Sequence, residues 1–417
     1  MNKRVLFFIP DLYRGGVATV CENLLMGFSK HNDIELSVCI YDNKPISKKI
    51  PEGVRVFRIN LPLWKNFGKN SLQRCLRGII RYPAAILGLV KFINIVLKEN
   101  PDVIAAHSNI MNLYSLIVKL LFPKRKYKVI ITEHVYKNSN TKKGLLIILD
   151  YLEKLLYPQA DAIVAISNPI ATYLQEKYLI DRSKICLIYN PLNMPEIITK
   201  AKEEISDIPN LFEQPVIITA GRFNIQKGQW HLIRSFKLVK QQIPDSKLVI
   251  LGDGELKLYF INLIKKLDLE NDVYLLGFQE NPFKFISRSS VFALPSLFEG
   301  FGMVLLEAMA CGVPVVSSDC RSGPREILAP VTDPSKQTMI PEFAEFGILV
   351  PVPDGTQYKP EDPLTKEEEI LAEVLVNVLS DRKIQNKYKA LGPQRARAFD
   401  VDKITSKWIN LINGLLR

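Results

Sequence analysis

The stretch that decides the fold runs from Ser296 to Val316 and has the sequence SLFEGFGMVLLEAMACGVPVV. Its segment from Met303 to Cys311 consists of strong helix formers. Gly312 and the nearby Pro314 predict that the helix ends there, because glycine favours the C-terminal cap and proline cannot continue a helix. The apolar run that follows predicts a buried strand. The stretch therefore predicts an α/β fold in which a loop, a helix and a strand succeed one another.

Two glutamates flank the predicted N-terminus of this helix. Glu299 lies in a glycine-flanked loop, and Glu307 lies about one turn into the helix, roughly 5 to 8 Å along the axis from the first free amides. Those amides attract anions, and Gly300 and Gly302 let a ligand approach the backbone closely. Glu299, the amides and Glu307 thus form, in this order, a hydroxyl acceptor, an anion site and a second hydroxyl acceptor. This order matches the sugar hydroxyls, the diphosphate and the ribose diol of a nucleotide-sugar. The alternative, two glutamates on a solvated surface, is disfavoured because a charge rarely faces apolar surroundings without a purpose.

The composition is that of a globular protein with room for two domains. A chain of 417 residues can bury two cores of ordinary size. Its six cysteines show no paired short spacing, which indicates reduced thiols rather than disulfides or a zinc site. The apolar start of the chain is too short for a secretion signal, and no apolar stretch is long enough to span a bilayer. A cytoplasmic location is expected, with peripheral attachment to the inner face of the membrane left open.

A basic and apolar stretch covers residues 61–98. The formal net charge of the chain is +12, which favours anionic partners. The stretch contains no Asp or Glu, while basic residues including Arg74, Arg77 and Arg81 alternate with aromatic and aliphatic ones. This pattern suits the headgroup region of an anionic membrane, and a helical hairpin that packs on its own domain fits equally well. Nucleic acid is not expected as a partner, because no recognition motif accompanies the charge.

Both halves of the chain alternate short β-branched runs with helical segments. This alternation predicts two α/β domains, each with a parallel sheet. The predicted domains cover 1–195 and 215–398, and the polar stretch from Met194 to Gln214 is the predicted linker. Two such domains leave a cleft, where ligands bind at the carboxyl ends of the strands. The expected strands are 4–9, 36–41, 54–59, 103–107, 129–133, 162–166, 185–189, 216–220, 247–251, 273–276, 291–295, 313–317 and 347–352.

Two cations follow the first predicted strand of the second half. Arg222 and Lys227 lie five positions apart in a glycine-bounded loop between this strand and the next helix. Fixed cations in this place can neutralise a departing diphosphate, the task that a metal performs in other enzymes. Nothing in the sequence requires a metal or a cofactor. The backbone at Gly252, after the next strand, can also approach a ligand closely.

Candidate ligand contacts in the first domain also follow predicted strands. Gly15 and Gly16 lie between the first strand and a helix, where backbone amides can contact a phosphate. They do not form the G-x-G-x-x-G fingerprint of dinucleotide-binding proteins, so a dehydrogenase is not expected. His107 and His134 end two adjacent strands, and two histidines at one cleft favour a substrate contact by at least one of them.

The residues at both glutamates resemble a known family. Glu299 and Glu307, with the glycines around them, resemble the E-x7-E signature of the retaining glycosyltransferases of family four, which have the GT-B fold. The segment 319–328 resembles the branch that builds bacterial surface glycans, in which transfer of galactose or N-acetylgalactosamine is common. The resemblance implies two Rossmann-like domains facing a cleft, with a C-terminal helix over 403–417 that crosses back to the first domain.

The resemblance also implies roles for individual residues. Arg222 and Lys227 match the family pattern R-x4-K, which holds the leaving diphosphate. His134 matches the family histidine that touches the donor sugar. Glu299 is expected to position the sugar and Glu307 the ribose. The other expected donor-pocket residues are Gly15, Gly16, Gly252, Phe278, Phe301, Gly302 and Met303.

The implied function is transfer of a hexose or N-acetylhexosamine from a nucleotide-sugar to a saccharide acceptor, with retention at the anomeric carbon. UDP is the expected base, a polyprenyl diphosphate-linked saccharide is the expected acceptor, and no metal is expected. Capsule, O-antigen or related glycan biosynthesis is the expected setting. A nucleotide-sugar epimerase of the same fold and a non-catalytic nucleotide-sugar-binding protein are the alternatives.

One segment departs from the family pattern. Residues 329–346 form an insertion that is rich in proline, threonine and acidic side chains. A long loop at the edge of a cleft fits a lid or a partner surface. It fits a plain surface loop equally well.

Overall fold

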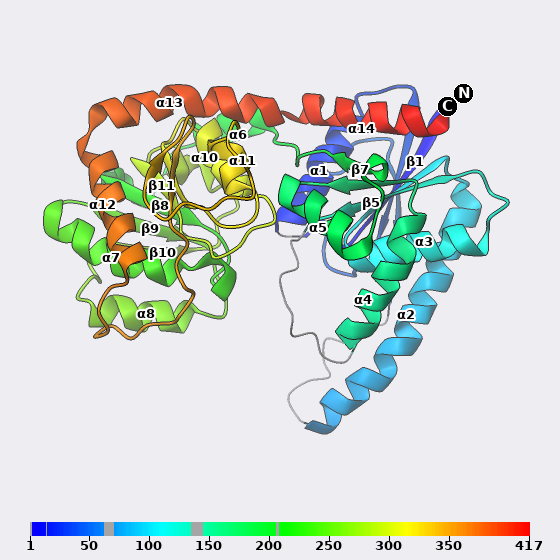
Figure 1. The fold of residues 1–417 in the computed structure, drawn as a ribbon, viewed down its shortest axis with the longest axis horizontal. Helices are drawn as coiled ribbons and strands as arrows, with labels where there is room; N and C mark the ends of the chain where they lie inside the picture. Colours follow the sequence, from blue (N-terminus) through cyan, green and yellow to red (C-terminus); the bar gives the residue numbers. More distant parts are fainter. Residues whose placement is uncertain (1, 14, 62–70, 135–144, 206–207) are drawn as a thin grey trace. The chain divides into compact units, whose positions relative to one another are not determined.

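The computed structural model describes residues 2–13, 15–61, 71–134, 145–205 and 208–417. Backbone contacts divide the chain into two compact units. Unit 1 consists of residues 1–166, 170–191 and 401–417, and unit 2 consists of residues 167–169 and 192–400. In Figure 1 each unit is a β-sheet covered by helices.

Unit 1 is built on a parallel sheet that has seven strands in the described residues. The inner strands are rich in β-branched residues and almost fully buried, as expected for a sheet covered on both faces, whereas the edge strand Arg55–Arg58 is partly exposed. The strand order β3-β2-β1-β4-β5-β6-β7 reverses direction between β1 and β4, which is the switch point of a doubly wound fold. The strands are β1 (Lys3–Ile9), β2 (Ile34–Ile40), β3 (Arg55–Arg58), β4 (Val103–His107), β5 (Lys128–Glu133), β6 (Ala162–Ala165) and β7 (Ile185–Leu187).

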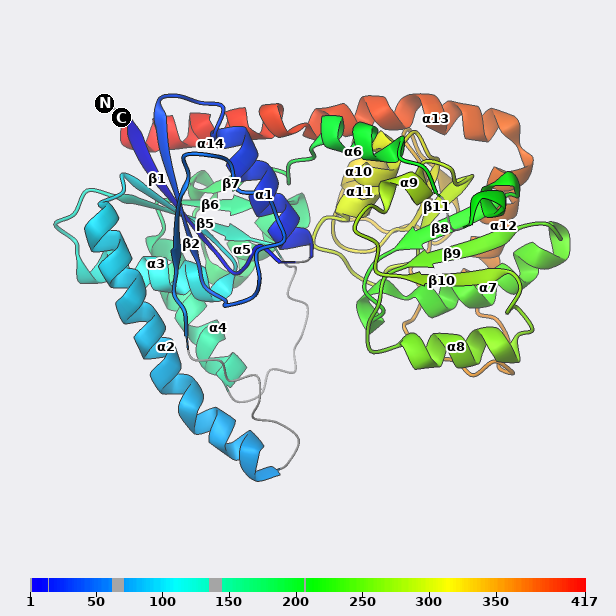
Figure 2. The ribbon, with the colours of Figure 1, turned by 180° about the vertical axis from the view of Figure 1, so that it is seen from behind.

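Helices cover both faces of the unit 1 sheet (Figure 2). They are α1 (Gly16–Phe28), α2 (Ser71–Glu99), α3 (Asn109–Leu121), α4 (Leu145–Leu156), α5 (Asn168–Tyr178) and α14 (Val401–Leu416). Successive side chains of β1 point to opposite faces. Phe7 packs against Trp408 of α14, whereas Phe8 stacks on Phe92 of α2 with ring centroids 3.9 Å apart. The C-terminal helix α14 therefore belongs to the core of unit 1, next to α1.

Unit 2 is also built on a mostly parallel sheet, again with seven strands in the described residues. Its order β10-β9-β8-β11-β12-β14-β13 places the switch point between β8 and β11, and β13 alone runs antiparallel to its neighbour among these strands. The strands are β8 (Val216–Ala220), β9 (Lys247–Leu251), β10 (Val273–Gly277), β11 (Val291–Leu294), β12 (Val315–Ser318), β13 (Glu342–Phe343) and β14 (Ile348–Val350).

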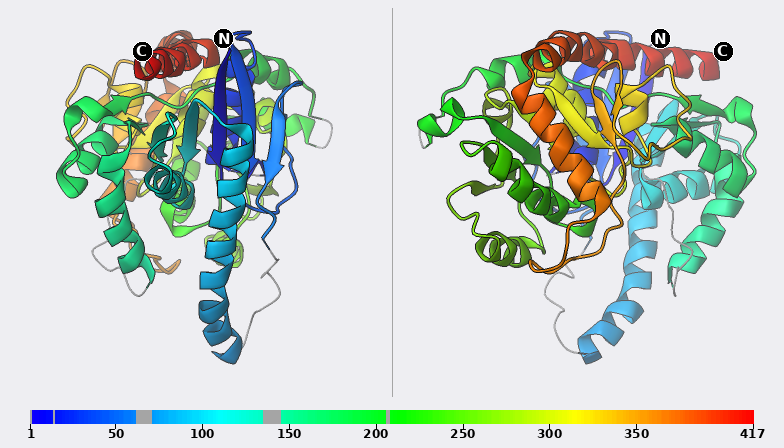
Figure 3. Two further views of the ribbon diagram at one scale, coloured as in Figure 1. Left: turned by 90° about the vertical axis from the view of Figure 1, so that its right-hand side faces the viewer. Right: turned by 60° about the vertical axis from the view of Figure 1, so that its left-hand side comes forward.

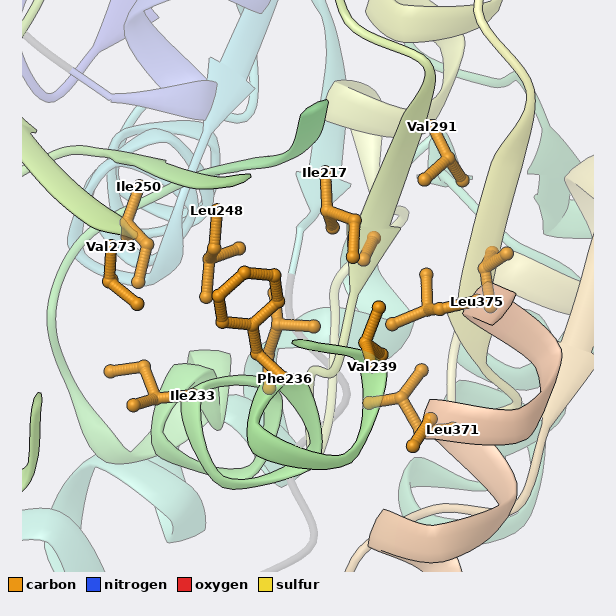
Figure 4. Close-up of a cluster of buried hydrophobic side chains, with 14 of the residues drawn as sticks. Ile217, Ile233, Phe236, Val239, Leu248, Ile250, Val273, Val291, Leu371 and Leu375 are labelled. Atoms are coloured by element: carbon orange, nitrogen blue, oxygen red, sulfur yellow. The ribbon is translucent and has the colours of Figure 1, made fainter. Parts of the chain in front are cut away.

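The helices of unit 2 enclose a dense apolar core. They are α6 (Met194–Ala201), α7 (Gln229–Gln242), α8 (Lys257–Lys266), α9 (Phe283–Ile286), α10 (Met303–Ala310), α11 (Pro324–Leu328), α12 (Lys366–Ser380) and α13 (Arg382–Ala396). Figure 4 shows Phe236 of α7 between Leu248 of β9 and the α12 side chain Leu371. The right-hand view of Figure 3 shows α12, in orange, with α13 leading away from its end. This core fixes α7 and α12 against the sheet and thereby the loops at its edge.

The predicted fold class is confirmed, because both units are α/β with parallel sheets. Each expected strand overlaps an observed one. The prediction of a linker over Met194 to Gln214 is wrong at its start: α6 begins there and packs against α9 and α10 of unit 2. The backbone described within 61–98 forms one long helix, α2, rather than a hairpin. None of the described helices is long and apolar enough to cross a membrane.

Candidate functional site

The site residues of unit 2 gather at the switch point of its sheet. Strands β8 and β11 are parallel neighbours, so their carboxyl ends lie at the same edge. The loop after β8 carries Arg222 and Lys227, and the loop after β11 carries Glu299. Open α/β sheets bind their ligands at such an edge. The strand order thus joins Lys227 and Glu299, which are 72 positions apart in the sequence.

The loop after β8 has a closely defined backbone. The Asn224 side chain accepts a hydrogen bond from the Lys227 amide at 3.2 Å and starts a short 3-10 turn. Gly228 follows with φ +57°, and a Cβ at this position would lie 2.4 Å from the Pro295 carbonyl oxygen. Only glycine tolerates both the left-handed conformation and this close approach. The turn therefore fixes the backbone that carries the Lys227 side chain.

Glu299 is the centre of a compact polar cluster. Its Oε1 accepts hydrogen bonds from Lys227 Nζ at 2.6 Å and from Ser296 Oγ at 2.7 Å. Gln226 Nε2 makes a longer contact of 3.5 Å to Oε2. Glu299 is only 6% exposed, and a carboxylate so deeply buried needs partners of this kind. Oε2, with the longer contact, is the oxygen better able to accept a hydrogen bond from a ligand hydroxyl.

Arg222 lies outside this cluster, although the sequence pattern groups it with Lys227. Its Nη2 is 3.5 Å from Glu255 Oε2, and both side chains are more than half exposed. Exposed ion pairs contribute about 1 kcal/mol or less. The guanidinium can therefore leave Glu255 for a more highly charged anion at small cost.

Helix α10 begins directly after the Glu299 loop, as the sequence predicts. Gly302 is its N-cap residue and has φ +86°, a conformation that glycine adopts readily. The amides of Met303 and Val304 precede the amide of Leu305, which donates to the Gly302 carbonyl oxygen at 2.9 Å. These two amides at the helix start can donate to a ligand, and the helix dipole favours an anion there. Glu307 lies one turn further and is partly exposed. The structure thus reproduces the predicted order of carboxylate, free amides and carboxylate.

Three other residues that the sequence places in the pocket for the sugar donor differ in how they can contact a ligand. Gly252 follows β9, and a Cβ there would lie 2.0 Å from the Gly221 carbonyl oxygen, so this glycine keeps two loops in contact. Phe278 follows β10 and is about half exposed, as a ring that stacks on a base would be. The Phe301 ring is buried against Phe399, with ring centroids 5.6 Å apart. Phe301 can therefore contact a ligand only through its backbone.

The expected contacts of unit 1 lie after its strands. Gly15 caps α1 with φ +113°, and no atom of the described chain would lie within 4 Å of a Cβ on Gly15 or Gly16. This open space lets a ligand approach the backbone. His134 follows β5, and burial lowers its pKa to about 4. Its ring is therefore neutral at neutral pH and acts through hydrogen bonds rather than charge.

The insertion at 329–346 is fastened to the carboxyl end of β12. Arg325 Nε donates to the two carboxylate oxygens of Asp319 at 3.2 and 3.1 Å, and its Nη2 donates to Glu342 at 2.8 Å. The Gln337 side chain donates to the Asp319 carbonyl at 2.8 Å. Burial raises the pKa of Asp319, and the hydrogen bond from Arg325 opposes this shift. This network favours a fixed surface loop over a hinged lid.

Ser296 and Gln226 were not anticipated as site residues. Both lie next to predicted site residues in the sequence, three positions before Glu299 and one before Lys227. Serine is common in turns and glutamine has no specific motif here, so their position alone carries little information. Only the pairing of β8 with β11 shows that Ser296 and Gln226 both contact the Glu299 carboxylate.

Comparisons with known proteins agree with this architecture. Two family models match the chain, "Glycosyltransferase Family 4" over residues 14–194 and "Glycosyl transferases group 1" over 201–333. An uncharacterised glycosyltransferase of Methanocaldococcus jannaschii is 35% identical over 340 residues, which are 78% of this chain and 82% of that protein. The N-acetylgalactosamine-N,N'-diacetylbacillosaminyl-diphospho-undecaprenol 4-alpha-N-acetylgalactosaminyltransferase of Campylobacter jejuni is 34% identical over 264 residues, 63% of each chain. The crystal structure of Anabaena HepE in complex with UDP and glucose matches with a TM-score of 0.70 at 20% identity, covering 99% of this chain and 100% of that one.

The two α/β units and the matching family models define a glycosyltransferase. The chain belongs to glycosyltransferase family 4, and its fold is GT-B. The predicted family, fold and enzyme class are thereby confirmed. The roles of the individual site residues and the stereochemical course stay predictions.

Proposed function

We propose that the enzyme transfers a hexose or N-acetylhexosamine from a UDP-sugar to a polyprenyl diphosphate-linked saccharide, with retention at the anomeric carbon. The observation that carries this proposal is the cluster of Lys227, Glu299 and Ser296 near the start of α10 in unit 2. It offers a cation, a hydroxyl acceptor and free helix amides at one sheet edge. The relatives support the chemistry, because the C. jejuni protein is named for an undecaprenyl diphosphate-linked acceptor and HepE binds UDP.

The leaving diphosphate is proposed to recruit the two cations of the loop after β8. A diphosphate carries more negative charge than a carboxylate, so it competes with Glu299 for the Lys227 ammonium. Within the described residues, the Arg222 guanidinium pairs with Glu255, and it can leave this exposed contact for the diphosphate. Together with the amides of α10, these groups stabilise the negative charge that develops as the sugar leaves. Metal-independent transfer stays a prediction; in the described ranges no group of three or more His, Cys, Asp or Glu side chains could hold a metal ion.

Glu299 is proposed to position the sugar rather than to attack it. The ion pair with Lys227 and the hydrogen bond from Ser296 draw charge from the whole carboxylate, because its two oxygens share the charge, and this makes Glu299 a weaker nucleophile. Attack by the acceptor hydroxyl on the face that the diphosphate leaves then gives retention. Glu307 is proposed to hold the ribose diol, and His134 and the Gly15–Gly16 amides of unit 1 are proposed to contact the sugar and the diphosphate.

Thermal stabilisation by nucleotide-sugars tests the donor assignment. A ligand that binds only the folded state at 100 times its Kd contributes about 2.7 kcal/mol of stability. We expect UDP-galactose, UDP-glucose and their N-acetylated forms to raise Tm, and GDP-sugars to leave it unchanged. Glu307→Ala should remove most of the shift, because the ribose loses its acceptor. Glu373→Ala, at an exposed position of α12, is the matched control and should keep the shift.

Turnover with the stabilising donor separates transfer from the two alternatives. An epimerase converts the sugar without an acceptor, whereas a transferase releases UDP only slowly until a lipid-linked saccharide is added. Stabilisation without turnover on any acceptor would favour a non-catalytic binding protein. Stabilisation by GDP-sugars alone would contradict the UDP assignment.

The lipid-linked acceptor implies contact with a membrane surface, and unit 1 exposes side chains that suit it. On α4, apolar residues at helical spacing share one face, and Lys154 is exposed beside them. Helices α2 and α4 follow strands β3 and β5 in the chain, and the carboxyl ends of these parallel strands lie at the edge of the sheet where His134 lies. The side chains of Arg74, Arg77 and Arg81 lie outside the described residues. Among the described side chains of these two helices, the exposed apolar ones are Ile86, Leu87, Val90, Ile147, Ile148, Tyr151 and Leu155.

Vesicle sedimentation tests this surface. We expect the protein to bind vesicles that contain anionic phosphatidylglycerol and to bind pure phosphatidylcholine poorly, since each basic residue near an anionic surface contributes about 1 kcal/mol. Replacing Arg74, Arg77 and Arg81 by Gln should reduce binding at least tenfold, by the same estimate. The matched control replaces three exposed basic residues after α3, at the edge where the strands begin, by Gln: Lys124, Arg125 and Lys126. Equal loss in both triple variants would show that net charge, not this surface, drives binding.

A further inference from the structure

A buried pair of histidines ends two neighbouring strands of unit 1. His107 is the last residue of β4, and His134 directly follows β5, which pairs with β4. His107 Nδ1 lies 3.1 Å from His134 Nε2, which is hydrogen-bond distance. His107 is completely buried, whereas His134 keeps a small exposed fraction of 7%. A ligand can therefore reach His134 but not His107.

Two aromatic rings hold His107 in place. Phe7 of β1 stacks on it, with ring centroids 5.6 Å apart and ring planes 12° apart. Trp408 of α14 lies 5.6 Å from the His107 ring centroid at an angle of 33°. A ring packed in this way cannot turn without opening the core. The orientation of His107 is therefore set by β1 and by the C-terminal helix.

The hydrogen bond between the two rings contains one proton. Burial lowers the pKa of His134 to about 4, and burial together with the neighbouring His134 lowers the pKa of His107 well below its usual value. Both rings are therefore neutral at pH 7, and each carries a single N–H. Either His107 Nδ1 donates to His134 Nε2, or the reverse.

The surroundings of His107 decide between these arrangements. If His134 donated, the proton of His107 would lie on its Nε2, which has no hydrogen-bond partner in the described part of the chain. A buried N–H without an acceptor is rarer in folded proteins than a buried acceptor without a donor. Donation by His107 leaves only an unpaired acceptor. The geometry therefore favours the N–H on His107 Nδ1.

We propose that His107 is a positioning residue, which donates from Nδ1 to His134 Nε2 and thereby fixes His134 as its Nδ1–H tautomer. His134 then presents a hydrogen-bond donor to an oxygen of its ligand. Trp408 contributes by keeping the His107 ring in its stack, which links the C-terminal helix to the site histidine. The identity of that oxygen as one of the donor sugar rests on the proposed function, whereas the tautomer is a property of the protein alone.

Nitrogen-15 NMR of the imidazole rings tests the tautomers directly. The chain has four histidines, so selective labelling of the whole protein gives few signals, and His107→Asn and His31→Gln help to assign them. We expect both His107 and His134 to carry the proton on Nδ1 at pH 7. A proton on Nε2 of His134 would overturn the proposal, and this result does not depend on any activity.

Two substitutions separate positioning from packing. His107→Phe keeps a ring between Phe7 and Trp408 but removes the donor, whereas His107→Asn keeps an N–H near the Nδ1 position. Because one neutral hydrogen bond is at stake, we expect H107F to lower kcat about tenfold and H107N to stay within about threefold of wild type. The His134 tautomer should become mixed in H107F alone. If H107F left both kcat and the His134 tautomer unchanged, the role of His107 would be limited to packing in the core.

A failure of the proposed function remains distinguishable from a failure of this inference. Wild-type protein that transfers no sugar from any UDP-sugar would refute the proposed function, while the NMR result on the wild type would still decide the tautomer. Conversely, an active enzyme with His134 protonated on Nε2 would retain the function and refute the positioning role.

Discussion

Replacing Glu299 by Gln is expected to lower kcat for sugar transfer by a factor of about 100 to 1,000, as for other groups that act on transition-state charge. The carboxylate is the partner of Lys227 at 2.6 Å and of Ser296 at 2.7 Å, and its other oxygen is the proposed acceptor for a sugar hydroxyl. A neutral amide keeps the shape but loses the charge that orients the lysine. Steady-state kinetics with the stabilising UDP-sugar and a lipid-linked acceptor would measure the effect.

The control for this substitution is an exposed glutamate of the same unit. Glu373→Gln on α12 should change kcat by less than about twofold, because surface substitutions away from a site have small effects. Thermal stabilisation by UDP should persist in E299Q, since the α10 amides and Arg222 remain. An E299Q enzyme with kcat within about threefold of wild type would refute a role for this carboxylate in the transition state.

Replacing Glu368 by Gln is expected to destabilise unit 2 by about 3 to 5 kcal/mol, the usual result of breaking a buried ion pair on one side. The Glu368 side chain is fully buried and accepts hydrogen bonds from His231 Nδ1 at 2.8 Å and from Arg234 Nε at 2.9 Å. It also completes the capping box of α12 with Thr365. The variant would leave the Arg234 guanidinium buried without its counter-ion.

Through Arg234, the loss of stability in the Glu368→Gln variant is expected to extend beyond α12. Its Nη atoms donate to backbone carbonyls of Lys359 and Pro363, both at 2.7 Å, so it ties the segment before α12 to α7. Hydrogen exchange should therefore accelerate in α7, in α12 and in this segment, and Tm should fall. Glu369→Gln, an exposed neighbour in the same first turn, is the control and should shift stability by about 0.5 kcal/mol or less. Equal exchange in both variants would show that the buried pair is not a stabilising link.

Much of the local structure was predictable from the sequence. The run from Met303 forms a helix, Gly302 starts it, and Gly312 with φ +72° ends it, because these signals depend on neighbouring residues alone. The strands followed in the same way from short β-branched runs. The linker prediction failed at α6, where Asn193 caps a helix whose apolar face packs on unit 2. A polar stretch of this length does not reveal that one of its faces is buried.

The candidate site was predictable only in part. Glycines, cations and carboxylates at strand ends pointed to the loops after β8 and β11, which the structure brings together. The sequence could not show that Lys227 pairs with Glu299 while Arg222 pairs with Glu255, or that the Phe301 ring faces the core. These outcomes depend on side-chain directions that the packing of each unit sets.

The sequence by itself determined the approximate positions of the strands and of helix α10, the α/β class, and the family, because these follow from short-range patterns and motifs. Only the tertiary structure decided which strand ends share an edge. Strand order places β8 beside β11, which joins Lys227 to Glu299, and β4 beside β5, which joins His107 to His134. Trp408 reaches His107 from the far end of the chain because α14 packs on β1. The physical reason is that contacts over such separations arise from the crossover connections and the burial of whole faces, which no local periodicity encodes.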